Sequence, residues 1–222
     1  MCTVSLIPCD DGFRLGCNRD ERRDRPPASP PRLHAAGSRT AIFPVDSAGP
    51  GTWVGVNDAG LAAVLLNRST LNAAVPQPMS RGLIVPEILA ASSLAQALAF
   101  LRVLRPPSFL PFVVVLALNR RLAIATSDGR ALSVTIRSLC QPVVFASSSL
   151  GDRLVQTTRG RLFERLVLRS SDPTGAQRRF HSHRWVDRPE LSIVMERSDA
   201  RTVSRTFIQA RSRTIEMQYE AL

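Results

Sequence analysis

Short apolar runs separated by turn residues dominate the start of the chain. The first run, residues 2–8, is followed by a turn at 9–12 and by a second run within 13–21. An Asp-Gly pair between two apolar runs is typical of an antiparallel hairpin. This hairpin folds the polar residues 18–21, Asn-Arg-Asp-Glu, back beside the start of the chain.

The same pattern predicts further strands. Residues 52–57 and 61–67 form a second hairpin, and the near-continuous apolar run 61–66 indicates burial on both faces. The proline-rich stretch 22–39 is predicted to be a loop or flap outside any sheet, because proline lacks the hydrogen-bond donor of a ladder. The other predicted strands are 40–44, 112–118, 121–127, 131–137, 142–146, 191–196, 202–210 and 214–219, with the four from 112 to 146 as one meander.

Apolar residues spaced by three or four predict helices. The first covers 81–91, the second begins after an N-cap at Ser92, and the third begins at Ser149 or Asp152. The predicted apolar faces are Leu94, Leu98, Leu101 and Leu104 on the second helix and Leu154, Thr158, Leu162 and Leu166 on the third. Residues 170–189 are predicted to be a loop or a short irregular element. This order permits two packed sheets with helices outside, although the pattern alone does not select one α+β arrangement.

Length and composition predict one domain, residues 1–222, since 222 residues with 44% hydrophobic content suit a sizeable core. No apolar run reaches the roughly 18 residues needed to span a bilayer, and no signal peptide is recognisable. The four cysteines, Cys2, Cys9, Cys17 and Cys140, lack CxxC spacing, so a reduced, cytoplasmic protein is expected. A Cys2–Cys17 disulfide across the first hairpin stays open as an alternative.

The net charge of +11 comes from arginine alone, since the chain has no lysine. The basic residues are scattered and aromatic residues make up only 5%, which gives no stacking platform and argues against a nucleic-acid partner. The charge favours an anionic small molecule as substrate or ligand. His181 and His183 have no recognisable third ligand, so neither a metal nor another cofactor is predicted, and both are assigned to a polar loop.

The second residue is the strongest candidate for chemistry. Removal of Met1 would leave Cys2 with a free α-amino group, so that one residue holds a nucleophile and a base. A free thiol has a pKa of about 8.5 and a terminal amine of about 7.7–8.0, which suits proton transfer near neutral pH. This is the arrangement of an N-terminal nucleophile.

The opening Met-Cys-Thr and the tetrapeptide 18–21 resemble the NRDE family, which includes the transport and Golgi organisation 2 proteins. Other matching stretches are 25–26, 51–57, 60–67, 80–82 and 200–204. More distantly, the layout is similar to choloylglycine hydrolases and penicillin V acylases, which cleave amides with an N-terminal cysteine. The resemblance implies a four-layer αββα sandwich of the N-terminal-nucleophile hydrolase type. Two mainly antiparallel sheets would lie between helical layers, and Cys2 would start an inner strand.

The resemblance also implies roles for individual residues. Asp20 would orient the Cys2 amine, and Asn67 would donate its side-chain NH₂ to an oxyanion; alternatively, Asn67 only ends a strand and bonds to backbone. Arg19 would lower the thiol pKa or bind a substrate carboxylate. Asn18 and Ser148 are assigned to substrate binding, the latter because the serines 147–149 replace a second oxyanion asparagine.

Two classes of function follow. The first is an N-terminal-cysteine amidohydrolase or acyltransferase acting on a small amide, ester or thioester. The second is a non-catalytic intracellular carrier of haem or of an acyl-CoA or lipid ligand, which uses the same pocket without turnover.

Overall fold

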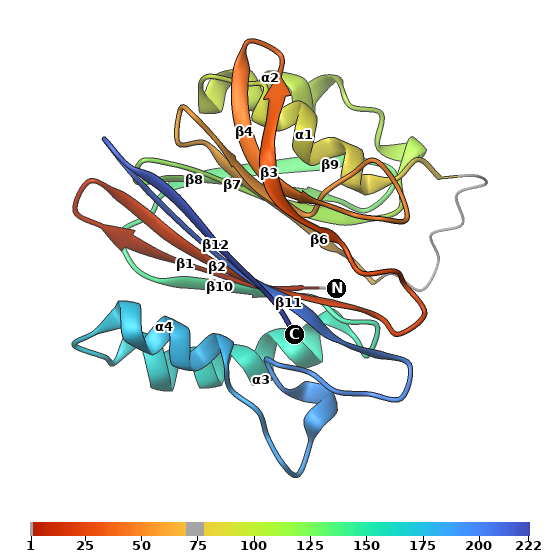
Figure 1. Cartoon of the computed structure of the whole chain (residues 1–222), viewed down its shortest axis with the longest axis vertical. Coiled ribbons are helices and arrows are strands. Elements are labelled where there is room, and N and C mark those ends of the chain that lie inside the picture. The colour runs from red at the N-terminus through yellow and green to blue at the C-terminus, as the bar shows by residue number, and fades with distance from the viewer. Residues whose placement is uncertain (1, 70–77) are drawn as a thin grey trace.

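The computed structural model describes residues 2–69 and 78–222, and among these the strands form two antiparallel sheets between two layers of helices (Figure 1). The five-stranded sheet has the order β10-β1-β2-β11-β12, and the seven-stranded sheet runs β3 to β9 in chain order. Helices α1 and α2 cover the outer face of the seven-stranded sheet, and α3 and α4 cover the other sheet (Figure 1). The predicted four-layer αββα sandwich is confirmed.

The strands are β1 Cys2–Cys9, β2 Gly12–Arg22, β3 Ser29–Ala36, β4 Arg39–Val45, β5 Val54–Asn57, β6 Ala62–Asn67, β7 Phe112–Leu118, β8 Arg121–Ser127, β9 Leu132–Ser138, β10 Val143–Ala146, β11 Ala200–Arg211 and β12 Ile215–Ala221. The helices are α1 Ile84–Leu89, α2 Leu94–Val103, α3 Asp152–Phe163 and α4 Pro173–His181. Short 3₁₀ turns lie at Arg81–Leu83, Pro106–Ser108 and Pro189–Leu191, and a π-helical turn, Glu164–Leu168, continues α3. None of the helices so described is long and apolar enough to cross a bilayer.

The first hairpin lies at the centre of the five-stranded sheet, because β10 pairs with β1 and β11 pairs with β2. Its register sets Cys2 opposite Arg19. Alternation along β1 then turns Cys2, Val4 and Leu6 into the core between the sheets, and turns Thr3 and Ser5 toward α3 and α4. The hairpin therefore has one apolar face and one buried polar face.

Asn57 fixes the second hairpin and the helix beside it. Its Oδ1 accepts hydrogen bonds from the backbone of Ala59 and Leu61, and its Nδ2 donates to the carbonyls of Leu89 and Ala91. Gly60 completes the turn with a φ of 79°, which favours glycine. These bonds tie the β5–β6 turn to the end of α1, and β6 carries Asn67 to the edge of the core.

Several predictions of strands and loops were wrong, because the local sequence does not show where a segment lies in a sheet. The proline-rich stretch 22–39 contains β3, which pairs with β4 and is an edge strand among the described residues, and missing donors are tolerated at a sheet edge. β10 leaves the predicted meander and pairs with β1 in the other sheet. Residues 191–196 begin at the last residue of the 3₁₀ turn Pro189–Leu191 and form an isolated bridge at Glu196 rather than a strand.

The helix predictions also needed correction. The N-cap of α2 is Ser93, whose side chain accepts from the Gln96 backbone N–H, rather than Ser92. The buried face of α3 is Val155, Arg159, Leu162 and Phe163, whereas Leu154 is exposed. The stretch 170–189 contains α4, which begins after an Asp172 N-cap.

Candidate active site

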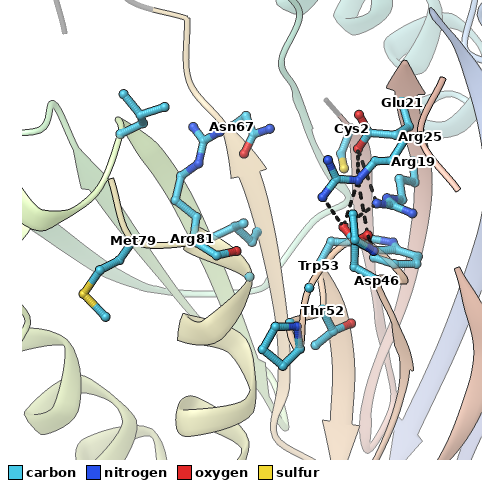
Figure 2. A pocket seen from close by; sticks show the side chains of 18 of the residues that line it. Cys2, Arg19, Glu21, Arg25, Asp46, Thr52, Trp53, Asn67, Met79 and Arg81 are labelled. Carbon is cyan, nitrogen blue, oxygen red and sulfur yellow. Dashed lines mark hydrogen bonds and ion pairs between the residues drawn. The ribbon is translucent and has the colours of Figure 1, made fainter. Parts of the chain in front are cut away.

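A cavity of about 550 Å³ opens at the end of the sheets where Cys2 lies (Figure 2). Its walls come from the ends of β1, β2 and β6, from the loop before β5, and from the segment that leads into α1. The lining includes the side chains of Cys2, Arg19, Glu21, Arg25, Asp46, Trp53, Asn67 and Arg81.

Cys2 is the first residue of β1 and is only 3% exposed. A hydrogen bond from Cys17 lowers the pKa of the Cys2 thiol, against the opposing effect of burial, and the charge of Arg19 adds to the lowering. The same contact and burial raise the pKa of Cys17 well above its ordinary value. Both thiols are free, so the Cys2–Cys17 disulfide is absent from this structure.

Arg19 is held by carboxylates of the protein itself. Its Nη2 lies 2.8 Å from Asp46 and 3.3 Å from Glu21, and its guanidinium carbon lies 4.0 Å from the centre of the Trp53 ring. Burial opposes the charge of Asp46, but hydrogen bonds from Arg25 and Ala48 and the charge of Arg19 hold the pKa of Asp46 below its usual range. Arg19 therefore contributes a fixed positive charge near the thiol, while its own carboxylate-binding capacity is occupied.

Asp20 lies on the other side of β2, against α3. It accepts hydrogen bonds from Thr202 Oγ1 at 2.6 Å and from Arg159 Nη1 at 3.4 Å, and it is 1% exposed. Arg19 pairs with Cys2, and Asp20 is the next residue along β2. Because β1 and β2 are antiparallel, Asp20 lies at the N-terminal end of β1. Asp20 is thus positioned near the backbone nitrogen end of Cys2 rather than in the cavity lining.

Asn67 ends β6 and lines both the main cavity and a second cavity of about 250 Å³. Within residues 2–69 and 78–222, its side-chain amide makes no hydrogen bond, so the backbone-bonded alternative has no support there. Its NH₂ is available to a ligand in the cavity.

Arg81 is a cavity residue to which sequence reasoning gave no role. Its Nη1 donates to the carbonyl of Pro111 at 2.8 Å, and burial lowers its pKa. The available signal was its place in the stretch 80–82, which was used only to support the family resemblance. Asp46, Trp53 and Arg25 were likewise not predicted, because nothing local in the sequence indicates that they meet Arg19.

Two predicted substrate-binding residues lie outside the main and second cavities. Asn18 Nδ2 donates to the carbonyls of His181 and Ile193, and its Oδ1 lies 2.7 Å from His181 Nδ1. Ser148 lies in the loop before α3: its N–H donates to Asp152 and its Oγ accepts from the Leu150 N–H. The neighbouring Ser147 is the serine near the nucleophile, with its Oγ 3.4 Å from the Cys2 nitrogen.

His181 belongs to α4 and not to a polar loop. Its Nε2 lies 2.7 Å from Ser5 Oγ and its Nδ1 contacts Asn18, an arrangement that resembles a Ser-His-Asn triad. All three side chains are fully buried, and burial lowers the pKa of His181 to about 3, so it is neutral at pH 7. The set joins α4 to the hairpin instead of meeting substrate. In the described part of the chain, no three His, Cys, Asp or Glu side chains are grouped to hold a metal ion.

The model of the family described as Transport and Golgi organisation 2 matches residues 7–211, a range that does not include Cys2. No protein with a curated description matches the chain in sequence. Among solved structures, the N-acylethanolamine-hydrolyzing acid amidase ortholog of Caenorhabditis elegans is 12% identical with a TM-score of 0.65, covering 93% of this chain and 92% of that one.

Two further structures match over the whole of this chain with TM-scores of 0.54. Penicillin V acylase from Agrobacterium tumefaciens is 13% identical, with 86% of that chain covered. A mutant of the conjugated bile acid hydrolase from Clostridium perfringens is 10% identical, with 92% of that chain covered. At these identities the likeness establishes a shared fold.

Proposed function

Because the chain belongs to the transport and Golgi organisation 2 family and has the fold of N-terminal-nucleophile hydrolases, we propose that it is a cysteine amidohydrolase or acyltransferase. The observation that carries this proposal is the Cys2 thiol, whose pKa is lowered and which lines a cavity together with Asn67, whose amide makes no hydrogen bond among the described residues. Its substrate is a small amide, ester or thioester. The three solved structures support this reaction class by analogy only.

The proposed reaction begins once Met1 is removed. The freed Cys2 amine takes the thiol proton, and the sulfur attacks the carbonyl carbon of the substrate. Asn67 donates to the oxyanion that forms, and the protonated amine passes its proton to the leaving group as the carbon–nitrogen, carbon–oxygen or carbon–sulfur bond breaks. Water then attacks the acyl-cysteine in a hydrolase, or an acceptor amine or alcohol attacks it in a transferase, and the free thiol returns.

Asp20 has the supporting role in this mechanism of holding the Cys2 amine. Arg159 and Thr202 keep Asp20 oriented, because both donate to its carboxylate from the helix side of the sheet. Arg19 stabilises the thiolate through its charge. In this mechanism Asp20 therefore acts on the amine of Cys2 and Arg19 on its thiolate, from opposite faces of β2.

Intact-mass measurement tests the proposal. Wild type, Cys2→Ser and Cys140→Ser proteins are exposed briefly to a panel of acyl-CoA thioesters and N-acyl amides, after the loss of Met1 has been checked by mass. We expect an acyl adduct on wild type and on Cys140→Ser, since Cys140 is an exposed thiol outside the cavity, and none on Cys2→Ser. Retained Met1, or Cys2-independent binding of haem or acyl-CoA without any adduct, would favour the carrier function instead.

A further inference from the structure

The charges around the cavity are almost balanced. Of the residues that the structure describes, the charged side chains in its lining are Arg19, Arg25, Arg81, Glu21 and Asp46. Asp46 bonds Arg19 and Arg25, each at 2.8 Å, and Glu21 lies 3.3 Å from Arg19 and 3.6 Å from Arg25. The positive charge left over is that of Arg81.

Arg81 has no carboxylate partner among the residues that the structure describes. Within residues 2–69 and 78–222 it forms no ion pair, and its one hydrogen-bond acceptor is the Pro111 carbonyl. Glu21 attracts it only through space. Residues 70–77 lie outside the described ranges, and their sequence contains neither Asp nor Glu. A half-buried guanidinium without a counter-charge is costly unless another group supplies one.

The guanidinium of Arg81 lies next to Asn67. The Pro111 carbonyl that accepts from Arg81 also accepts from the backbone N–H of Arg68, at 3.0 Å, and Arg68 directly follows Asn67. Figure 2 shows the Arg81 side chain extending from the segment before α1 toward Asn67 at the end of β6. A group that binds Arg81 is therefore close to a group that binds Asn67.

On the basis of the function proposed above, we propose that Arg81 is the anion-binding residue of the cavity and that it selects substrates with a carboxylate within a few bonds of the scissile carbonyl. A guanidinium keeps several N–H donors after one is used for Pro111, and it binds a planar carboxylate with two parallel hydrogen bonds. N-acyl amino acids have this spacing. The phosphates of an acyl-CoA lie many bonds from its thioester, so the position of Arg81 beside Asn67 favours the amino-acid conjugate.

Equilibrium binding to a Cys2→Ala protein tests the assignment without turnover. The probes are N-octanoylglycine and its neutral counterpart N-octanoylglycinamide, which differ in the carboxylate alone. We expect the anion to bind about tenfold more tightly or better, because a charge-assisted hydrogen bond is involved, and we expect this preference to fall as salt rises. Octanoyl-CoA, as a third probe, should show no loss of affinity on changing Arg81.

The preference should disappear in Arg81→Gln and persist in part in Arg81→Lys, which keeps the charge but not the planar fork. Arg102→Gln is the matched control, because Arg102 is exposed on α2 and lies outside the cavity lining, so the preference should be unchanged. Circular dichroism and the urea midpoint show that each variant is folded. An anion preference that survives in Arg81→Gln, or no binding by either octanoyl-glycine probe to the folded Cys2→Ala protein, would overturn the assignment.

This measurement is independent of the acyl-adduct experiment. A protein that binds the anion through Arg81 but never forms an adduct on Cys2 would keep the assignment of Arg81 and lose the proposed catalysis. The converse result, an adduct without an Arg81-dependent preference, would keep the catalysis and remove Arg81 from substrate selection.

Discussion

At the scale of single residues, the side chains around the cavity divide into those that influence the Cys2 thiol and those that the proposed function assigns to ligand binding. Cys17 and Arg19 lower the thiol pKa, and Arg19 is itself neutralised by Asp46 and Glu21. Asn67 lacks a partner within the described residues, and Arg81 bonds only the Pro111 carbonyl there. The residues that lower the thiol pKa are thus different from the residues whose hydrogen-bond donors remain available among the described residues.

The hydrogen bond from Cys17 predicts how the reactivity of the Cys2 thiol depends on pH. Because it lowers the pKa of Cys2, Cys17→Ala should raise that pKa and shift the pH–rate profile for alkylation of Cys2 by iodoacetamide to higher pH. Mass spectrometry of labelled peptides gives the profile for each thiol. Cys9→Ser, at the far end of β1, should leave the Cys2 profile in place; an equal shift in both variants would contradict the role given to Cys17.

Asn67→Ala should slow formation of the acyl adduct by roughly 10²–10³-fold, since that is the usual effect of removing one oxyanion donor. The thermal midpoint should stay close to that of wild type, because the described structure shows no hydrogen bond of this side chain to be lost. Parallel losses of stability and rate would instead indicate that Asn67 serves to end its strand.

At the scale of elements, the first hairpin is held from behind by α3 and α4 through polar contacts. Arg159 reaches from α3 to Asp20 and Thr3, and it is 1% exposed, as is Asp20. Gly16 on β2 lets His181 approach the strand, since a Cβ there would lie 2.6 Å from His181 Nε2. The helical layer therefore fixes the strands that carry Cys2 and Arg19.

Arg159→Met should cost about 3–5 kcal/mol of folding free energy, because it takes the Arg159 guanidinium away from the buried Asp20 carboxylate. Arg161→Met, on the exposed side of the same helix, is the control and should change stability little. Adding Asp20→Asn to Arg159→Met should recover part of the loss. Urea denaturation measures all three, and equal costs for the two arginines would refute the role of the buried pair.

Gly16→Ala and Gly160→Ala form a matched pair with opposite expected signs. The first should destabilise by about 1–3 kcal/mol through overpacking against His181. The second should stabilise by about 0.4–1 kcal/mol, since a Cβ at Gly160 in the interior of α3 meets nothing within 4 Å. Thermal unfolding midpoints provide the comparison, and destabilisation by both changes would contradict the close-approach argument.

At the scale of the whole molecule, hydrophobic clusters follow one another across the layers. One lies between α1, α2 and the seven-stranded sheet, the next between the two sheets, and the third beneath α3 and α4. Cys2 belongs to the cluster between the sheets, and the cavity opens beside it. Because the seven-stranded sheet contributes to the first two clusters and Val144 of β10 packs against the third, loss of one layer should loosen the others.

We therefore expect residues 1–222 to unfold as one cooperative unit. The two tryptophans provide local probes, since Trp53 belongs to the cluster between the sheets and Trp185 packs against the cluster of α3 and α4. Single-tryptophan variants, Trp53→Phe and Trp185→Phe, should give the same urea midpoint by fluorescence as by circular dichroism, after correction for the small stability change of each. Two separated transitions would mean that the layers unfold independently.

Sequence by itself determined the local elements and the candidate nucleophile. Alternation and turn residues located both hairpins, the run 61–66 was recognised as a buried strand, and the position of Cys2 made it the candidate nucleophile. The resemblance on residues 18–21 and the later matching stretches led to the layered fold. These features could be found because they depend on residues close together in the chain, or on motifs that can be matched directly.

Only the tertiary structure decided which partners those elements meet. The spacing of apolar residues indicates that a strand is buried but does not indicate which strand pairs with it. The pairing of β10 with β1 in the five-stranded sheet was therefore not predictable. The same limit hid the positions of two residues: Asn18 lies toward α4, and Arg81 lies beside Asn67. Both outcomes depend on contacts between residues distant in the chain, and strand register and side-chain direction fix those contacts.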